Sequence, residues 1–103
     1  MLLSRKKKAK ESRQTPPPES GKLEDILELG TFYFLNQKYD EAAAQFENAI
    51  KMDPMRAKTY YNLGVIYEIQ NRCPDARTML SKAIELDPHM ACAQTHLDKL
   101  VGG

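Results

Sequence analysis

The sequence predicts an all-α protein built from stacked antiparallel pairs of helices. Two observations lead to this prediction: the chain repeats itself after 34 residues, and apolar residues within each unit recur every three or four positions. Steps of three and four place apolar side chains on one face of a helix, and a repeat of this length is typical of helical arrays. The 103 residues leave room for one small domain.

The repeat is visible when the chain is aligned with itself at an offset of 34 residues. Leu29-Gly30 then pairs with Leu63-Gly64, and Asp53-Pro54 pairs with Asp87-Pro88. The other matches are Tyr33 with Tyr67, Ala42 with Ala76, Phe46 with Leu80, and Ala49-Ile50 with Ala83-Ile84. The chain therefore contains one structural unit written twice.

Polar segments and prolines mark the ends of the helices. Asn36-Gln37-Lys38 and Gln70-Asn71-Arg72 divide each unit at its middle, where a short turn reverses the chain. Pro54 and Pro88 close the units, because proline biases the preceding residue away from the α conformation, and Pro74 suits the first turn of a helix. We therefore expect helices at 23–36, 40–52, 57–70, 74–86 and 90–101.

Two glycines occupy the same position in the middle of the first helix of each unit. Gly30 and Gly64 each cost about 0.5–1 kcal/mol relative to alanine in a helix. A close approach of the second helix would explain both glycines. That helix has small residues at matching positions, namely Ala42, Ala49, Ala76 and Ala83.

The residues at these positions resemble the tetratricopeptide-repeat (TPR) family over residues 23–90. The matches are Leu29-Gly30, Tyr33, Ala42, Phe46, Ala49 and Pro54 in the first unit, and Tyr60, Leu63-Gly64, Tyr67, Ala76, Leu80, Ala83 and Pro88 in the second. Ile26 and Tyr60 stand where the family most often has tryptophan, and Leu80 replaces the commoner phenylalanine. The resemblance implies a right-handed superhelical solenoid of about five helices, whose first helices line a concave groove.

We expect four segments along the chain. Residues 1–22 form a disordered basic arm with a proline-rich spacer, 23–56 and 57–90 form the two repeats, and 91–103 form a capping helix. The arm has a net charge of +5 and residues 23–103 a net charge of −4, and the arm has too few apolar residues to fold. In the capping helix Asp98 replaces the glycine. The inward-facing residues expected there are Leu97, Leu100 and Val101.

The resemblance implies a non-enzymatic protein–protein interaction module, a scaffold or adaptor that binds a peptide or helical segment in the groove. Asn62 either brackets a ligand backbone, since its amide both donates and accepts, or only satisfies neighbouring polar groups. The expected lining is Leu27, Glu28, Thr31, Phe34 and Leu35 from the first helix, Lys58, Tyr61, Asn62, Val65, Glu68 and Ile69 from the third, and Thr95 and His96 from the last.

One subclass of the family binds the acidic C-terminal tails of heat-shock chaperones with a clamp of lysine, arginine and asparagine residues. Only Asn62 matches that clamp here. The other clamp positions hold Leu27, Thr31, Cys92 and His96. A bound terminal carboxylate loses its hydration, and without paired cations no ion pair would offset that cost. We therefore expect no capture of chaperone tails.

The alternative function is structural. The first helix is apolar nearly all round because of Leu27, Phe32, Phe34 and Leu35. Such a helix is normally covered, which suggests a homo-oligomer that self-assembles through this helix and the groove. The basic arm would then make weak contacts with an anionic membrane surface or with nucleic acid, unless it is only a solvated tail. Its cations are Arg5, Lys6, Lys7, Lys8 and Lys10.

Catalytic chemistry is not expected. The chain has no glycine-rich phosphate loop, nucleophile elbow or pair of carboxylates in an apolar setting. His89, Cys92 and His96 have helical spacing but lack an evident fourth ligand, so we expect no metal, cofactor or small-molecule substrate. Two cysteines, no signal-peptide core and no membrane-length apolar run favour a cytoplasmic protein, or one peripheral at a membrane surface.

Overall fold

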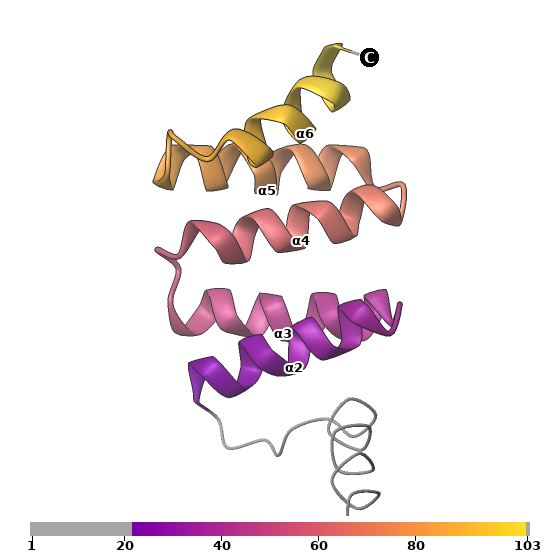
Figure 1. The fold of residues 1–103 in the computed structure, drawn as a ribbon, viewed down its shortest axis with the longest axis vertical. Coiled ribbons are helices and arrows are strands. Elements are labelled where there is room, and N and C mark those ends of the chain that lie inside the picture. Colours follow the sequence, from indigo (N-terminus) through magenta and orange to yellow (C-terminus); the bar gives the residue numbers. More distant parts are fainter. Residues whose placement is uncertain (1–21, 103) are drawn as a thin grey trace, which may run out of the picture.

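The computed structural model describes residues 22–102, which form five helices and no strand (Figure 1). The all-α class is thereby confirmed, and every helix begins and ends within one residue of the expected position. The helices are α2 (Leu23–Leu35), α3 (Tyr39–Met52), α4 (Ala57–Ile69), α5 (Cys73–Leu86) and α6 (Ala91–Gly102). The predicted basic arm lies outside the described residues, except for Lys22.

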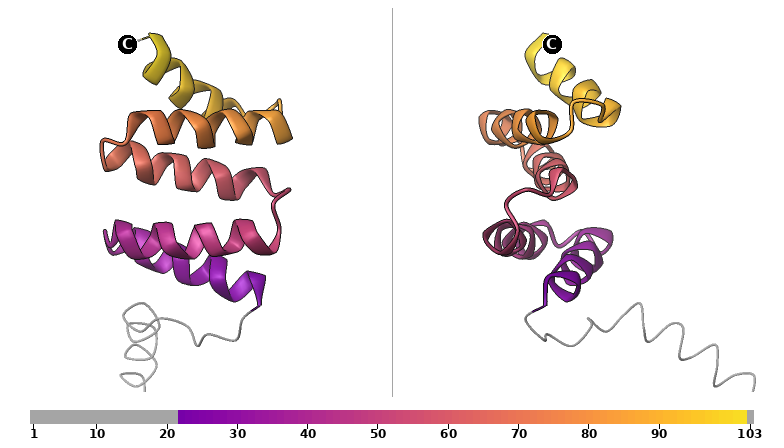
Figure 2. Two further views of the ribbon diagram at one scale, coloured as in Figure 1. Left: turned by 180° about the vertical axis from the view of Figure 1, so that it is seen from behind. Right: turned by 90° about the vertical axis from the view of Figure 1, so that its left-hand side faces the viewer.

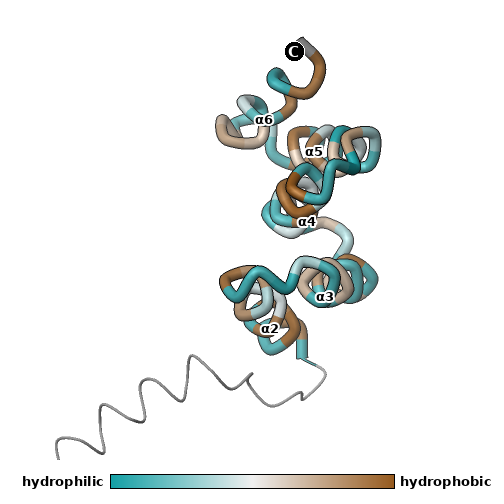
Figure 3. The backbone as a smooth tube through the Cα atoms, turned by 90° about the vertical axis from the view of Figure 1, so that its right-hand side faces the viewer, coloured by the Kyte–Doolittle hydropathy of each residue, from teal (hydrophilic) through white to brown (hydrophobic). Residues whose placement is uncertain are grey.

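The helices alternate between two sides of the molecule. Helices α2, α4 and α6 lie on one side, which we call the first-helix side, and α3 and α5 lie on the other (Figure 2). Figure 3 shows the same two columns from the opposite direction. Each helix packs on its neighbours in the sequence, most extensively α2 on α3 and α4 on α5. The chain therefore forms two antiparallel helix pairs followed by a single helix.

The two turns within the pairs have the same geometry. Gln37 and Asn71 both adopt a left-handed backbone conformation with φ of 62°. In each turn the following residue donates a main-chain hydrogen bond back into the helix, from Lys38 to Tyr33 O at 2.9 Å and from Arg72 to Tyr67 O at 2.8 Å. Asparagine tolerates this conformation better than glutamine, so the equal geometry reflects the repeated packing more than the local sequence.

The repeated apolar residues form the core. One buried cluster joins the first pair to α4 and α5 and contains Ala42, Ala43, Phe46, Leu63, Ile66, Tyr67 and Ala76. A second joins α4, α5 and α6 and contains Tyr60, Leu80, Ala83 and Ala93. Ala42, Ala49, Ala76 and Ala83 are completely buried. The expected small residues therefore lie where the paired helices meet.

The predicted close approach at both glycines is confirmed by the distances. A Cβ atom added to Gly64 would lie 2.8 Å from Cγ of Leu80, and one added to Gly30 would lie 3.0 Å from Cζ of Phe46. Both separations are shorter than ordinary carbon–carbon contacts of about 3.5–4.0 Å. The neighbouring helix therefore leaves no room for a Cβ atom at Gly64 unless Leu80 moves, and leaves little room at Gly30.

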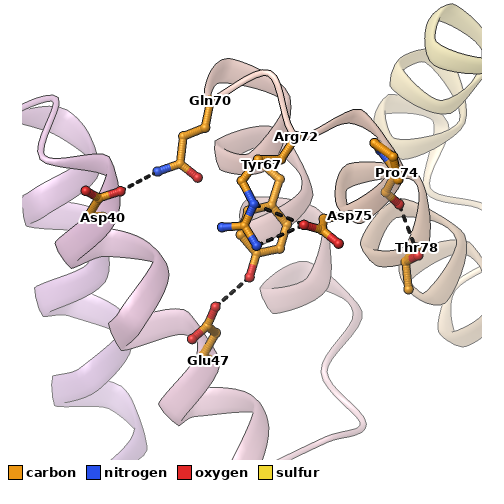
Figure 4. A network of polar contacts seen from close by, with 8 residues as sticks. All are labelled: Asp40, Glu47, Tyr67, Gln70, Arg72, Pro74, Asp75 and Thr78. Atoms are coloured by element: carbon orange, nitrogen blue, oxygen red, sulfur yellow. Dashed lines mark hydrogen bonds and ion pairs between the residues drawn. The ribbon is translucent and has the colours of Figure 1, made fainter.

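Polar side chains connect the two pairs. The Tyr67 hydroxyl on α4 donates a hydrogen bond to Glu47 Oε2 on α3, and Gln70 Nε2 donates to Asp40 Oδ1 at 2.7 Å (Figure 4). The guanidinium of Arg72 lies over the Tyr67 ring, 4.2 Å from its centroid, and pairs with Asp75 at 2.9 Å. Burial and the hydrogen bond to Glu47 raise the pKa of Tyr67 to about 12. These contacts, the α3–α4 joint, set the position of α4 relative to the first pair.

Helix α6 covers the second pair as expected, but one expected inward residue is wrong. Leu97 and Leu100 are half-buried and pack against the core, whereas Val101 is 67% exposed. Ala93, which sequence reasoning missed, is completely buried. The spacing explains the difference, because positions 93, 97 and 100 fall within about 60° of one another around the helix, whereas position 101 lies about 80° from position 93 and about 100° from position 100.

Replacing Gly64 with alanine should destabilise the fold by about 1–3 kcal/mol through overpacking against Leu80. The loss should appear even though alanine is intrinsically favoured over glycine in helices by up to ~1 kcal/mol. Urea unfolding followed by circular dichroism measures the change. In a Leu80→Ala background the same substitution should be neutral or stabilising. A stabilising effect in the wild-type background would contradict the close approach.

Replacing Tyr67 with phenylalanine should remove a pH-dependent part of the stability. The pKa of Tyr67 is about 12 in the folded chain against 10.0 for an unperturbed tyrosine, so its contribution is complete below pH 10 and is lost as the pH rises toward 12. The free energies of unfolding of wild type and Tyr67→Phe should therefore converge as the pH rises through this range. A constant difference would show that Tyr67 does not titrate in this way.

Candidate functional site

The candidate site is the first-helix side, and α4 is its central helix (Figure 2). The expected lining residues of α4 do lie on one face of that helix. Tyr61, Asn62, Val65 and Glu68 are half-buried, and Lys58 is exposed at its first turn. The four half-buried side chains border the packed interior and still reach solvent.

The expected residues of α2 divide into two groups. Leu27 and Phe34 pack against the first core cluster, and the Phe34 ring meets the edge of Tyr39 with centroids 5.8 Å apart. They therefore act mainly in packing. Glu28 and Thr31 are exposed, and the Thr31 hydroxyl donates a hydrogen bond to Leu27 O at 2.9 Å. Helix α2 thus offers polar groups to this side of the molecule.

Asn62 is a polar residue on the same face of α4 as Tyr61 and Val65. Its side-chain amide makes no hydrogen bond to any residue between 22 and 102, although the residue is half-buried. The two roles left open by the sequence can now be compared. The amide does not satisfy a polar neighbour in the described structure, so its donor and acceptor remain available to a ligand.

A compact cluster joins α4 to α6. His96 Nδ1 lies 2.7 Å from Glu68 Oε1, Lys99 Nζ lies 4.0 Å from Glu68 Oε2, and the rings of His96 and Tyr61 meet edge to face with centroids 5.7 Å apart. Burial raises the pKa of Tyr61, with further contributions from the Cys92 thiol and from Glu68. Tyr61 also packs against the second core cluster.

This cluster changes the chemistry expected of the site. Sequence reasoning placed Glu68 and His96 on the same side but missed that they pair, because contact between residues on different helices depends on how those helices are stacked. The Glu68 carboxylate already has two cationic or polar neighbours and is not free for a basic ligand group. The charged groups of the expected lining that keep no ion pair within residues 22–102 are Glu28 and Lys58.

The described residues contain no group of three or more His, Cys, Asp or Glu side chains arranged to hold a metal ion. Cys73 and Cys92 are free thiols and both are exposed. No helix within residues 22–102 has the length and apolar character needed to cross a bilayer.

Comparison with known families identifies the repeated unit. A family described as TPR repeat matches residues 30–71, and a second described as tetratricopeptide repeat matches residues 57–90. Together the two matches span residues 30–90, from the middle of α2 to the end of the second helix pair. A comparison with curated protein sequences gives no significant match.

Solved structures with a similar fold agree with this assignment. A crystal structure of MamA superposes with a TM-score of 0.78 at 22% identity, covering 82% of this chain and 50% of MamA. The first TPR of Spaghetti (RPAP3), bound to the HSP90 peptide SRMEEVD, gives 0.75 at 18% identity and covers 79% of this chain and 64% of that one. YrrB, described as a TPR protein with an unusual peptide-binding site, gives 0.69 at 31% identity, covering 72% and 38%. The chain thus spans about half the length of MamA.

Replacing Glu68 with glutamine should loosen α6 from α4, because His96 and Lys99 both lose their carboxylate partner. Amide hydrogen exchange in α6 should accelerate about fivefold if the interaction contributes ~1 kcal/mol. Glu85→Gln is the matched control, since Glu85 pairs with Lys82 on its own helix and connects no two helices. Equal exchange in the two variants would mean that the Glu68 cluster does not hold α6.

Proposed function

This chain belongs to the tetratricopeptide-repeat family, and we propose that it is a non-enzymatic interaction module that binds a segment of another protein on its first-helix side. The observation that supports this best is the half-buried Asn62 amide without a hydrogen-bond partner among the described residues. Similar folds described as peptide-binding, the first TPR of Spaghetti and YrrB, support the same class of function. The protein would then serve as a scaffold or adaptor.

The chemistry of α4 suggests how a ligand would bind. The Asn62 amide can both donate to and accept from a peptide backbone, which fixes an extended segment without reading its sequence. Val65, one helical turn further along, offers a half-buried apolar contact. Lys58 lies one helical turn before Asn62 on α4, and Glu28 is an exposed carboxylate on α2, on the same side of the molecule. The proposed ligand is therefore a segment with an accessible backbone, one apolar side chain and charges of both signs.

An acidic chaperone tail does not suit this site. Of the clamp positions, Leu27 packs against the core and Thr31 bonds its own helix. His96 is paired with Glu68, and Lys99 also lies beside that carboxylate. A ligand carboxylate would thus find no free pair of cations to replace its water. We propose a ligand class different from the peptides bound in the RPAP3 structures.

The two helix pairs, residues 23–56 and 57–90, are proposed as the binding repeats, and residues 91–103 as the cap that completes one side of the site. In this arrangement α4 supplies the main contacts, while α2 and α6 border it. The cap contributes by holding Tyr61 and Glu68 in place through His96.

Replacing Asn62 with alanine should weaken peptide binding about tenfold, which corresponds to one or two lost hydrogen bonds worth ~1.4 kcal/mol. The probes are peptides selected from a displayed random library on the wild-type chain, with affinities measured by calorimetry. Asn48→Ala is the matched control, because Asn48 is an exposed asparagine on α3, on the opposite side. The proposal fails if no peptide is selected, or if both variants bind the selected peptides as the wild type does.

A further inference from the structure

The two ends of the helix stack differ from its middle in one respect. Each end exposes residues whose equivalents in the middle repeat are buried by a neighbouring helix. Helix α2 lies at one end and α6 at the other (Figure 1). Because the unit repeats after 34 residues, each residue near an end can be compared with its equivalent in the middle. This comparison shows which surfaces lack a partner helix in the described structure.

At the α6 end there is an open hollow of about 730 Å³ between α5 and α6. Its apolar floor includes Leu97 and Val101, the equivalents of Leu63 and Tyr67. Leu63 is 1% exposed and Tyr67 6% exposed, whereas Val101 is 67% exposed. In the middle of the array α5 packs on the equivalent face of α4, and no helix within residues 22–102 covers this face of α6 in the same way.

At the α2 end the uncovered residue is Phe32. Its equivalent is Ile66, which is completely buried between the two pairs. Phe32 is only half-buried, and its ring is partly shielded by an edge contact with Tyr33 at 5.7 Å. Leu35, one turn further along, is 73% exposed. An aromatic side chain at the centre of an uncovered face is the kind of anchor that dominates protein interfaces.

The α2 end is acidic, whereas the border of the hollow has a slight excess of basic residues. Helix α2 carries Glu24, Asp25 and Glu28 and no basic residue, and residues 23–56 have a net charge of −4. The hollow is bordered by Arg77, Lys82 and Glu85. Lys82 pairs with Glu85, while Arg77 keeps no partner within the described residues. Contact between two α2 helices would bring like charges together, whereas contact of α2 with the hollow would place carboxylates near a free guanidinium.

We infer that the hollow between α5 and α6 receives helix α2 of a second copy of this chain, so that copies associate head to tail. Phe32 and Leu35 cover Leu97 and Val101, and the acidic first turns of α2 face Arg77. The wall of the hollow runs from Arg77 to Glu85, about 12 Å of helix, which matches the two turns of α2 between Glu28 and Leu35. Asn62 and Val65 lie outside this contact, so the inference is independent of the proposed peptide site.

A head-to-tail contact uses two different surfaces, and this makes it testable by mixing variants. Val101→Asp blocks the hollow and Leu35→Asp blocks α2, and both residues are exposed enough to tolerate aspartate without unfolding. Sedimentation velocity of the full chain from about 1 μM to about 1 mM would measure the association. We expect the wild type to form growing oligomers, each variant alone to be monomeric, and an equal mixture to form a dimer that does not extend.

Three results would overturn the inference. These are a wild type that stays monomeric throughout, a mixture in which the two variants do not pair, and a single variant that still dimerises, which would show a symmetric contact. Phe32→Ser provides a second test of the α2 surface and should weaken association at least tenfold while circular dichroism remains unchanged. Met55→Asp serves as a matched control for Leu35→Asp, because Met55 is a 69% exposed apolar residue between α3 and α4, outside both surfaces, and its replacement should leave association unchanged.

Discussion

The structure depends on how closely the two helices of each pair approach. Gly64 lies against Leu80 at a distance that leaves no room for a Cβ atom, and Gly30 lies against Phe46 at a distance that leaves little. In each pair the large side chain of the second helix, Phe46 or Leu80, packs directly on the backbone of the first helix. Completely buried alanines of the second helix lie beside it. Because both pairs are built in this way, they have nearly the same shape, and the repeated turns at Gln37 and Asn71 follow from that shape.

The similar shapes of the two helix pairs do not by themselves determine how one pair stacks on the other. The α3–α4 joint does so with polar groups, since Tyr67 bonds Glu47 and Gln70 bonds Asp40 across the two pairs. These bonds are directional, and they add orientation to the apolar contacts, which are not directional. The position of α4 on the first-helix side, and hence of Asn62, is a consequence of the joint.

The same small size that makes the fold simple leaves much of it uncovered. An array of two helix pairs has one interface between the pairs and two terminal faces that no further pair covers. Repeat proteins usually need at least about three repeats to bury a continuous core. Helix α6 reduces this exposure by covering Leu80 and Ala83 with Ala93 and Leu97. The surfaces that remain open at α2 and beside Val101 offer apolar area that a further contact can bury.

Helix type, helix ends and the repeat with its family were determined by the sequence itself, because they depend on spacing along the chain. The sequence also indicated the role of the two glycines, because both recur at the same position of the repeat opposite small residues of the next helix. The pairing of Glu68 with His96, the packing of Leu27 and Phe34 into the core and the exposure of Val101 were decided only in the tertiary structure. These features depend on the distance and rotation between helices that are far apart in the chain. Asn62 depends on both: helical spacing in the sequence places it on the same face of α4 as Tyr61 and Val65, and the stacking leaves its amide without a hydrogen-bond partner among the described residues.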